Sequence, residues 1–419
     1  MGGGSMETSQ EKFLMHRFPI VILLITCLVL MGGCGGKREV DELAFVLGMG
    51  IDLGKEEGTY LITMQMAQPK PSGGGGAAEL ENRTISMEAP SLAIMVERVA
   101  ETFNKYPFAG TARVIVLGEE LSKSGINETL DFFQRFYEFR RSIYLLVAKG
   151  DAKDLLETEL RTKKIPSHNL ISTIESQKRQ SAFPTTRLGH YLTILGRESQ
   201  NPIIPTVEKV KSGDKDLYLP NDEGEELLIH KSCVFEDGKL VATLNDQETN
   251  GFLWLDDEIY SRYLYKKDEN GIGITAWVLN SKTKYKIEEI DGKMGITFKI
   301  KARVAINEIS GKHEEMDTKK WRDFMESLGP ILEQAIQEEC EAAVAKNREL
   351  GLDFIGIGRK IEIKEPKYWK QVKSTWPHCV SDTPVAYSIE VSIEHSGLAR
   401  NSPVSPQKSE SKEGSKTPQ

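Results

Sequence analysis

The chain has 419 residues and a formal net charge of −8, with acidic and basic residues interspersed along most of its length. A chain without a long basic stretch is not expected to bind nucleic acid. Beyond the N-terminus no apolar run approaches the roughly 18 residues that indicate a membrane-spanning helix, so we expect a water-soluble body. A body of about 385 residues has room for two or three domains of ~100–200 residues each.

The first distinctive segment is an uncharged apolar run from Phe18 to Met31, which follows the basic residue Arg17. Its length suits the roughly 7–15 residue hydrophobic region of a secretory signal peptide and is too short to cross a bilayer. Small residues follow and lead to Cys34, in a pattern similar to a bacterial lipobox. We therefore predict that residues 1–33 are a signal peptide and that Cys34 is diacylated. The alternative is a buried strand or core helix with an incidental cysteine.

Residues 34–160 are predicted to form an N-terminal α/β domain. Alternating apolar residues indicate a first hairpin of two strands, and a helical stripe follows. Short apolar strands then alternate with further helices, an order typical of helices packed on a sheet. The Gly-rich segment 69–78 is expected to be an exposed loop. The predicted strands are 43–52, 60–68, 83–87, 113–117 and 143–148, and the predicted helices are 91–103, 130–139 and 152–159.

Residues 161–225 are predicted to be a middle segment that forms a second domain. Its first helix would be capped by Ser167 or Asn169, because short polar side chains accept the free N–H groups of a helix start. The polar, Gly- and Asp-rich segment 212–226 marks the boundary to the next domain. The expected helices are 167–181 and 188–195, and the expected extended segment is 202–210.

Residues 226–398 are predicted to be a C-terminal α/β domain. Asp237-Gly238 between two apolar runs is a strong hairpin signal. The clearest strand, 295–306, alternates apolar with polar residues, which predicts one buried and one solvated face. A long helix follows, with Asp317 as its expected cap and Pro330 as an expected kink or break. The long helix is predicted at 318–350, and a new element is expected to begin at 251–255. The tail 399–419 is expected to be disordered. Further strands are expected at 227–234, 239–244, 273–279, 284–289 and 387–394.

The long helix and the clearest strand are predicted to pack on each other. Apolar residues recur along one stripe of the helix, and such a stripe normally faces a sheet. Trp321 and Phe324 should therefore contact the strand face that carries Ile296, Phe298 and Ile300.

Few residues point to chemistry. Cys233, Cys340 and Cys379 have no CxxC spacing, and either one disulfide or three separate thiols fits them. The glycines of Gly48-Met49-Gly50 and Gly356-Ile357-Gly358 are expected to serve tight turns and close backbone approach rather than nucleotide binding. The histidines are isolated, without the i, i+4 pair of a metal site. The sequence predicts no catalytic residue, no cofactor-binding residue, no metal ligand and no enzyme activity.

Two segments resemble the Ger(x)C family of spore germination lipoproteins. The first is KREVDELAFVLGMGIDL, just after the predicted lipidation site, and the second is LGLDFIGIGRKIEIKEPKYWKQVKSTWP near the C-terminus. The chain departs from the family where Gly35-Gly36 replace the usual Trp-Asp after the cysteine, and where a tail continues beyond Leu398. The family features are met by Asp353, Gly356, Gly358, Pro366, Trp369, Trp376, Gly397 and Leu398, and by the mid-chain segment Gly251–Leu255.

The resemblance implies a fold of three α/β domains, with mixed sheets covered by helices, and no known enzymatic activity. It also implies that the chain is the C subunit of a nutrient germinant receptor, with the membrane subunits A and B as partners. The expected location is the outer face of the inner spore membrane, held by the lipid on Cys34. The alternative is a substrate-binding lipoprotein of a transporter, which would need two similar lobes around a cleft. The two halves of the sequence show no repeat.

Overall fold

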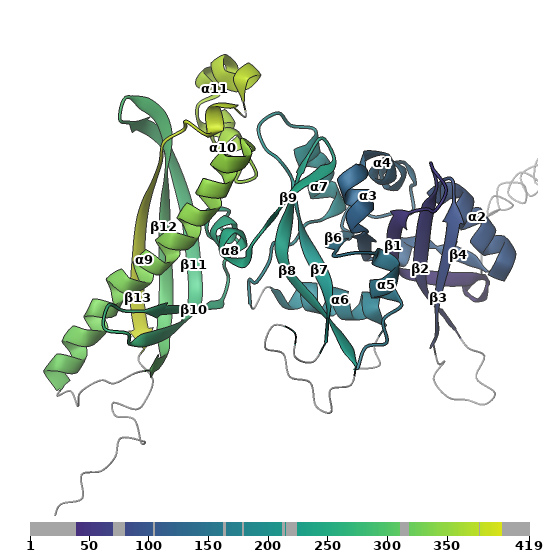
Figure 1. The fold of residues 1–419 in the computed structure, drawn as a ribbon, viewed down its shortest axis with the longest axis horizontal. Coiled ribbons are helices and arrows are strands. Elements are labelled where there is room, and N and C mark those ends of the chain that lie inside the picture. The colour runs from purple at the N-terminus through teal and green to yellow at the C-terminus, as the bar shows by residue number, and fades with distance from the viewer. Residues whose placement is uncertain are drawn as a thin grey trace, which may run out of the picture.

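In the part of the chain that the structure describes there are two sheets, one of nine strands and one of four, and helices pack on each of them (Figure 1). The predicted mixed α/β architecture is therefore confirmed. The computed structural model describes residues 39–69, 80–103, 105–161, 165–177, 180–211, 214, 224–310, 318–376 and 378–395. The predicted signal peptide, the lipidation site Cys34, most of the Gly-rich loop, the cap Asp317 and the tail 399–419 lie outside these residues.

The first sheet runs in the order β3-β2-β1-β5-β6-β7-β8-β9, with β4 paired to β1. Its central strands β1, β5, β6 and β7 are parallel, and antiparallel strands extend it on both sides. All four residues of β5 are buried, as expected for a parallel strand covered on both faces. The strands are β1 (Leu43–Leu53), β2 (Tyr60–Pro69), β3 (Leu80–Ala89), β4 (Tyr106–Phe108), β5 (Val114–Leu117), β6 (Tyr144–Ala148), β7 (Ile203–Lys211), β8 (Glu225–Glu236) and β9 (Lys239–Leu244).

Helices cover both faces of this sheet. In β5, Ile115 and Leu117 join one hydrophobic core, and Val114 and Val116 join the other. The first core also contains α2, α3, α4 and α7, and the second contains α5 and α6. These helices are α2 (Leu92–Phe103), α3 (Glu119–Ser124), α4 (Asn127–Arg135), α5 (Ala152–Leu156), α6 (Pro166–Ser176) and α7 (Leu188–Leu195), with short 3-10 helices at Val40–Glu42 and Ala109–Thr111.

The second sheet has the order β10-β11-β12-β13, and the long helix α9 lies across it (Figure 1). Its last pair, β12 and β13, is parallel, and the other pairs are antiparallel. The elements are β10 (Arg262–Lys267), β11 (Gly273–Ile290), β12 (Lys293–Ser310), β13 (Val385–His395), α8 (Asp246–Leu255), α9 (Thr318–Leu350), α10 (Ile357–Lys364) and α11 (Pro366–Val372), with 3-10 helices at Lys373–Thr375 and His378–Val380.

The predicted packing of the long helix on β12 is confirmed for the described residues. Ile296, Phe298 and Ile300 are fully buried in one core with residues of α9, and Phe324 packs against this core while remaining partly exposed. The side chain of Trp321 lies outside the described residues. Helix α9 continues through Pro330, so of the two outcomes expected there, a kink or a break, the break does not occur.

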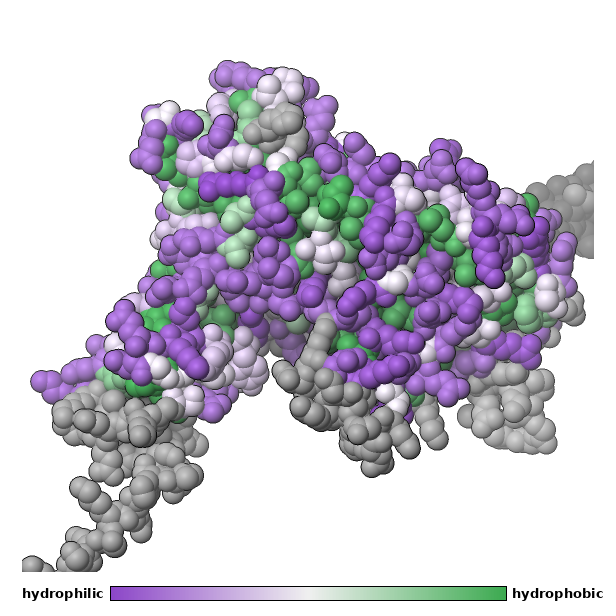
Figure 2. Space-filling model, viewed as in Figure 1, coloured by the Kyte–Doolittle hydropathy of each residue, from purple (hydrophilic) through white to green (hydrophobic). Residues whose placement is uncertain are grey.

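The two sheets share hydrophobic contacts. Ile203, Val234 and Leu244 of the first sheet belong to the same core as α8, α9 and the second sheet. On the face shown in Figure 2, hydrophilic side chains dominate, and the hydrophobic ones appear in separate groups. The predicted division into domains at residues 160 and 225 stays a prediction, although β7, β8 and β9 pair with the earlier strands in one sheet.

Several predicted boundaries were wrong. Helix α4 ends at Arg135 rather than 139, because the aromatic residues that follow pack as a cluster without continuing the helix. Helix α6 begins at Pro166, so neither Ser167 nor Asn169 caps it, and a proline suits the first helical position. Helices α5 and α6 end at Leu156 and Ser176, before the predicted ends at 159 and 181. Segment 251–255 is the end of α8 and not the beginning of a new element. The two predicted strands 273–279 and 284–289 are parts of one strand, β11.

Candidate functional site

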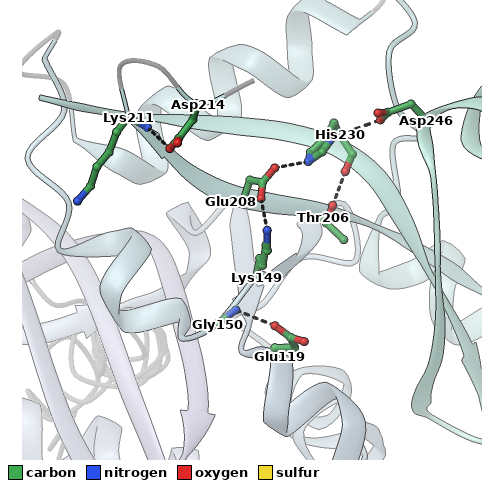
Figure 3. Close-up of polar contacts among 9 residues, drawn as sticks. All are labelled: Glu119, Lys149, Gly150, Thr206, Glu208, Lys211, Asp214, His230 and Asp246. Atoms are coloured by element: carbon green, nitrogen blue, oxygen red, sulfur yellow. Dashed lines mark hydrogen bonds and ion pairs between the residues drawn. The ribbon is translucent and has the colours of Figure 1, made fainter. Parts of the chain in front are cut away.

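A group of charged side chains meets where the parallel strands of the first sheet end (Figure 3). Glu119 begins α3 directly after β5, and Lys149 follows β6. Glu208 lies on β7, and His230 lies on β8 opposite Thr206 of β7. The carboxyl ends of parallel strands are the usual ligand-binding edge of an open α/β sheet.

The group is built around the buried carboxylate of Glu208, which is 6% exposed. Lys149 Nζ donates to Glu208 Oε2 over 2.9 Å, and His230 Nε2 lies 2.6 Å from Glu208 Oε1. On its other side, His230 Nδ1 lies 3.2 Å from Asp246 Oδ1 at the start of α8. A buried carboxylate needs such partners to offset its desolvation. The group therefore connects β6, β7 and β8 to the helix that leads into the second sheet.

A cavity of about 190 Å³ adjoins this group. Cys233 lines it, and burial raises the pKa of its thiol to about 12, so the sulfur is protonated at neutral pH. A thiol in this state is a poor nucleophile. The cavity is further lined by Val147, Ala148, Thr206, Lys231, Leu240 and Thr243. The lining thus combines the charged group with apolar side chains.

A second polar centre is the buried Asp353, which is 0% exposed. Its Oδ1 accepts the N–H of Ile357 over 2.8 Å, and its Oδ2 accepts the N–H of Gly358 over 2.6 Å. The indole Nε1 of Trp376 also donates to Oδ2, over 3.1 Å. Burial raises the pKa of this carboxyl, and the hydrogen bonds oppose the shift. Asp353 thus holds the start of α10 and the following tryptophan together.

Glycine is needed at two positions of this turn for two different physical reasons. Gly356 has a φ of 71°, a left-handed conformation that is costly for residues with a Cβ. At Gly358 an added Cβ would lie 2.6 Å from Nε1 of Trp376, so a larger residue would displace the indole. The sequence expectation of tight turns and close backbone approach is confirmed for this motif.

The mid-chain motif Gly251–Leu255 lies where α8 crosses α9. An added Cβ at Gly251 would lie 1.9 Å from the carbonyl oxygen of Glu339, so only glycine permits this crossing distance. The indole Nε1 of Trp254 donates to Glu339 Oε2 over 2.7 Å. Arg262 on β10 donates two further hydrogen bonds, each of 3.0 Å, to the same carboxylate. The motif therefore fixes α8, α9 and the second sheet to one another.

The two sheets are also joined by polar contacts. Asp353 N donates to Oδ1 of Asn201 over 2.9 Å, and Asn201 N donates to the carbonyl of Asp353 over 2.8 Å. Close by, Glu258 lines a small cavity with residues of α7. Burial raises the pKa of Glu258 to about 8, with a smaller contribution from Asp256 and an opposing hydrogen bond from the Thr185 backbone. Glu258 is therefore mostly protonated at neutral pH.

The other residues considered as candidate sites in the sequence lie in the body of the fold. Gly48 and Gly50 lie within β1, where an added Cβ would approach side chains of α6 and α5 to 2.6 and 2.9 Å. Cys233, Cys340 and Cys379 are free thiols, which settles the alternative between one disulfide and separate thiols. Among the described residues, no cluster of three or more His, Cys, Asp or Glu side chains is arranged to hold a metal ion.

Sequence reasoning missed the group around Glu208 and His230. The signal that could have found it is the placement of Glu119 and Lys149, each shortly after a correctly predicted strand.

No helix among the described residues is long and apolar enough to cross a bilayer.

Comparison with known proteins identifies the family. The family described as "Spore germination protein N-terminal domain" matches residues 36–209, and "Spore germination B3/GerAC like, C-terminal" matches residues 230–397. The chain belongs to the Ger(x)C family of spore germination proteins. The resemblance found in the sequence is thereby confirmed.

Curated relatives match this family member over nearly their whole length. Spore germination protein KC of Bacillus subtilis is 24% identical, with 92% of this chain and 97% of the relative covered. Spore germination protein B3 of the same organism is 25% identical, with 91% and 98% covered. The crystal structure of the GerBC protein is 21% identical and matches with a TM-score of 0.51, covering 82% of this chain and 97% of that one. This likeness confirms the fold.

Proposed function

We propose that this chain is the lipid-anchored C subunit of a spore nutrient germinant receptor. The observation that carries the proposal is the extent of the family match, which begins at residue 36, two positions after Cys34, and ends at residue 397. A lipid on Cys34 would therefore lie at the very start of the family body. The germination function named for each relative supports the same role.

In this proposal the subunit acts by assembling with the membrane subunits A and B on the outer face of the inner spore membrane. A single acyl chain binds membranes only marginally, whereas two chains anchor a protein stably. Anchoring confines the body to the membrane plane and raises its effective concentration near membrane partners. A stable contact needs about 800 Å² per partner, which two adjoining α/β units can provide without a deep pocket.

Deletion of the gene tests this function. We expect loss of germination in response to one set of nutrients, with normal growth and sporulation. Affinity purification of the tagged subunit from spore membranes should recover two multi-spanning subunits. Recovery of a transporter permease instead would favour the alternative of a substrate-binding lipoprotein. Normal germination on every nutrient that the parent strain responds to, in a strain without related receptors, would contradict the proposal.

A further inference from the structure

A second cavity lies at the opposite edge of the parallel strands from the Glu208 group. Its volume is about 460 Å³, within the roughly 300–1,000 Å³ of small-molecule sites. Arg113 lines it directly before β5, Arg140 shortly before β6, and Arg187 directly before α7. Three separate segments of the chain thus bring a guanidinium group to one hollow.

The donors of this cavity are only partly used. Arg187 Nη2 donates to the hydroxyl of Tyr144 over 3.1 Å, and its guanidinium carbon lies 4.9 Å from the centre of that ring. Arg113 forms an ion pair with Glu175 on α6. The side chain of Arg140 forms no hydrogen bond or ion pair with any other described residue, and only its backbone carbonyl is used, by the N–H of Ile143. Each guanidinium has five N–H donors, so most of the donors are available to a ligand.

The charge of the lining is positive although the chain is acidic. Three arginines face one carboxylate, that of Glu175. The lining therefore has an excess of two positive charges in a chain whose formal charge is −8.

We propose that this cavity binds a small phosphate-bearing ligand. A phosphate group carries about two negative charges at neutral pH and presents strong acceptor oxygens in several directions. Guanidinium groups match such oxygens with paired hydrogen bonds, which a lysine cannot do. Ser142 and Tyr144 also line the cavity and add hydroxyl donors. This site is separate from the proposed assembly role and does not rest on it.

The full chain, purified in detergent and kept in phosphate-free buffer, allows a direct test by titration calorimetry. The probes are inorganic phosphate and glycerophosphoglycerol, the diester headgroup of phosphatidylglycerol. We expect one site per chain and weaker binding at higher NaCl concentration, because salt screens the exposed charges. Arg140→Ala should raise the Kd at least about tenfold through loss of charge-assisted hydrogen bonds. Arg140→Lys should recover only part of the affinity.

The matched control is Arg135→Ala, because Arg135 is an exposed arginine on the adjacent helix α4 that pairs with Asp131 and does not line the cavity. Thermal unfolding of both variants should be close to that of the parent chain, since the Arg140 side chain has no polar contact to lose and the exposed Arg135–Asp131 pair contributes little to stability. Tighter binding of inorganic phosphate than of the diester supports the proposal and identifies a free phosphate compound. The reverse order also supports it and identifies a lipid headgroup.

Two results would overturn the proposal. One is the absence of binding heat with both probes at millimolar concentration. The other is an equal loss of affinity in Arg135→Ala and Arg140→Ala, which would show nonspecific attraction to surface charge. If Arg140→Ala instead releases a protein partner while neither probe binds, the cavity receives an acidic protein segment and not phosphate.

Discussion

At the scale of single residues, three acids with little access to water show how this protein accommodates a carboxyl group. Asp353, Glu258 and Glu208 each lie in surroundings that disfavour an unpaired charge, and the charge of each is compensated or removed in a different way. Asp353 accepts three hydrogen bonds, Glu258 takes up a proton, and Glu208 is flanked by a lysine and a histidine. Such differences arise from tertiary contacts, so the sequence alone could identify Asp353 only through its motif.

We predict that Asp353→Ala destabilises the protein strongly. The substitution leaves the N–H groups of Ile357 and Gly358 and the indole N–H of Trp376 without their acceptor. Each buried donor left unsatisfied costs about 1–3 kcal/mol, so a total of at least about 3 kcal/mol is expected in urea unfolding. Asp382→Ala, at an exposed acid of the same region, is the control. A cost of Asp353→Ala below about 1 kcal/mol would show that these contacts are not essential to the fold.

The raised pKa of Glu258 predicts a pH dependence of stability. Its folded-state pKa of about 8 lies above the ordinary value of 4.5, so the folded chain holds this proton more tightly than the unfolded chain. The contribution of Glu258 to stability therefore declines as the pH rises from about 4.5 to about 8. Glu258→Gln, which cannot ionise, should have a smaller fall in Tm between pH 5 and pH 8 than the parent chain. Parallel Tm curves of the two proteins would refute the assignment.

At the scale of elements, the sequence was informative where one local pattern determined the outcome. The alternation in β12 placed Ile296 and Phe298 on the buried face correctly, and Asp237 and Gly238 formed the predicted turn with φ values of 49° and 80°. Prediction failed where packing overrode a pattern. The aromatic residues after Arg135 have helical spacing, yet they pack without a helix.

The candidate site was harder to predict than the elements that carry it. Glu208 and His230 are far apart in the sequence and become neighbours only because β7 and β8 pair in a register with a shift between Pro205 and Thr206. No short motif encodes that register. The turn at Asp353 was recognisable because its residues lie within one short segment.

The buried face of β12 supplies a stability prediction. Phe298 is fully buried beneath α9, and its truncation to alanine should cost about 3–5 kcal/mol from lost burial and a new cavity. Phe324 is partly exposed, so Phe324→Ala should cost less than Phe298→Ala. Tyr137→Ala, at a side chain that is 88% exposed, should change the free energy of unfolding by no more than about 0.5 kcal/mol. Equal costs at positions 298 and 137 would contradict the observed packing.

At the scale of the whole molecule, the two sheets are held together by a shared core and by the paired hydrogen bonds between Asn201 and Asp353. The mid-chain and C-terminal family motifs lie at these junctions. Gly251 allows α8 to approach α9, and Asp353 holds the turn that meets the first sheet. A body built in this way presents a defined surface to partners, which suits the proposed role in receptor assembly.

The proposed anchor leads to the last prediction. We expect the mature chain to begin at Cys34 with a diacylglyceryl group on its sulfur, detectable by mass spectrometry of the N-terminal peptide. Cys34→Ala should shift the chain from the membrane to the aqueous fraction when the receptor subunits are absent, because two acyl chains provide the stable membrane affinity. Cys379→Ala is the matched control, since Cys379 is a free, partly buried thiol within the body. A Cys34→Ala chain that stays wholly in the membrane without its partners would exclude the lipid as the anchor. If the variant is released from the membrane and germination also fails, anchoring is required for function, because tethering is what keeps this subunit concentrated beside its membrane partners.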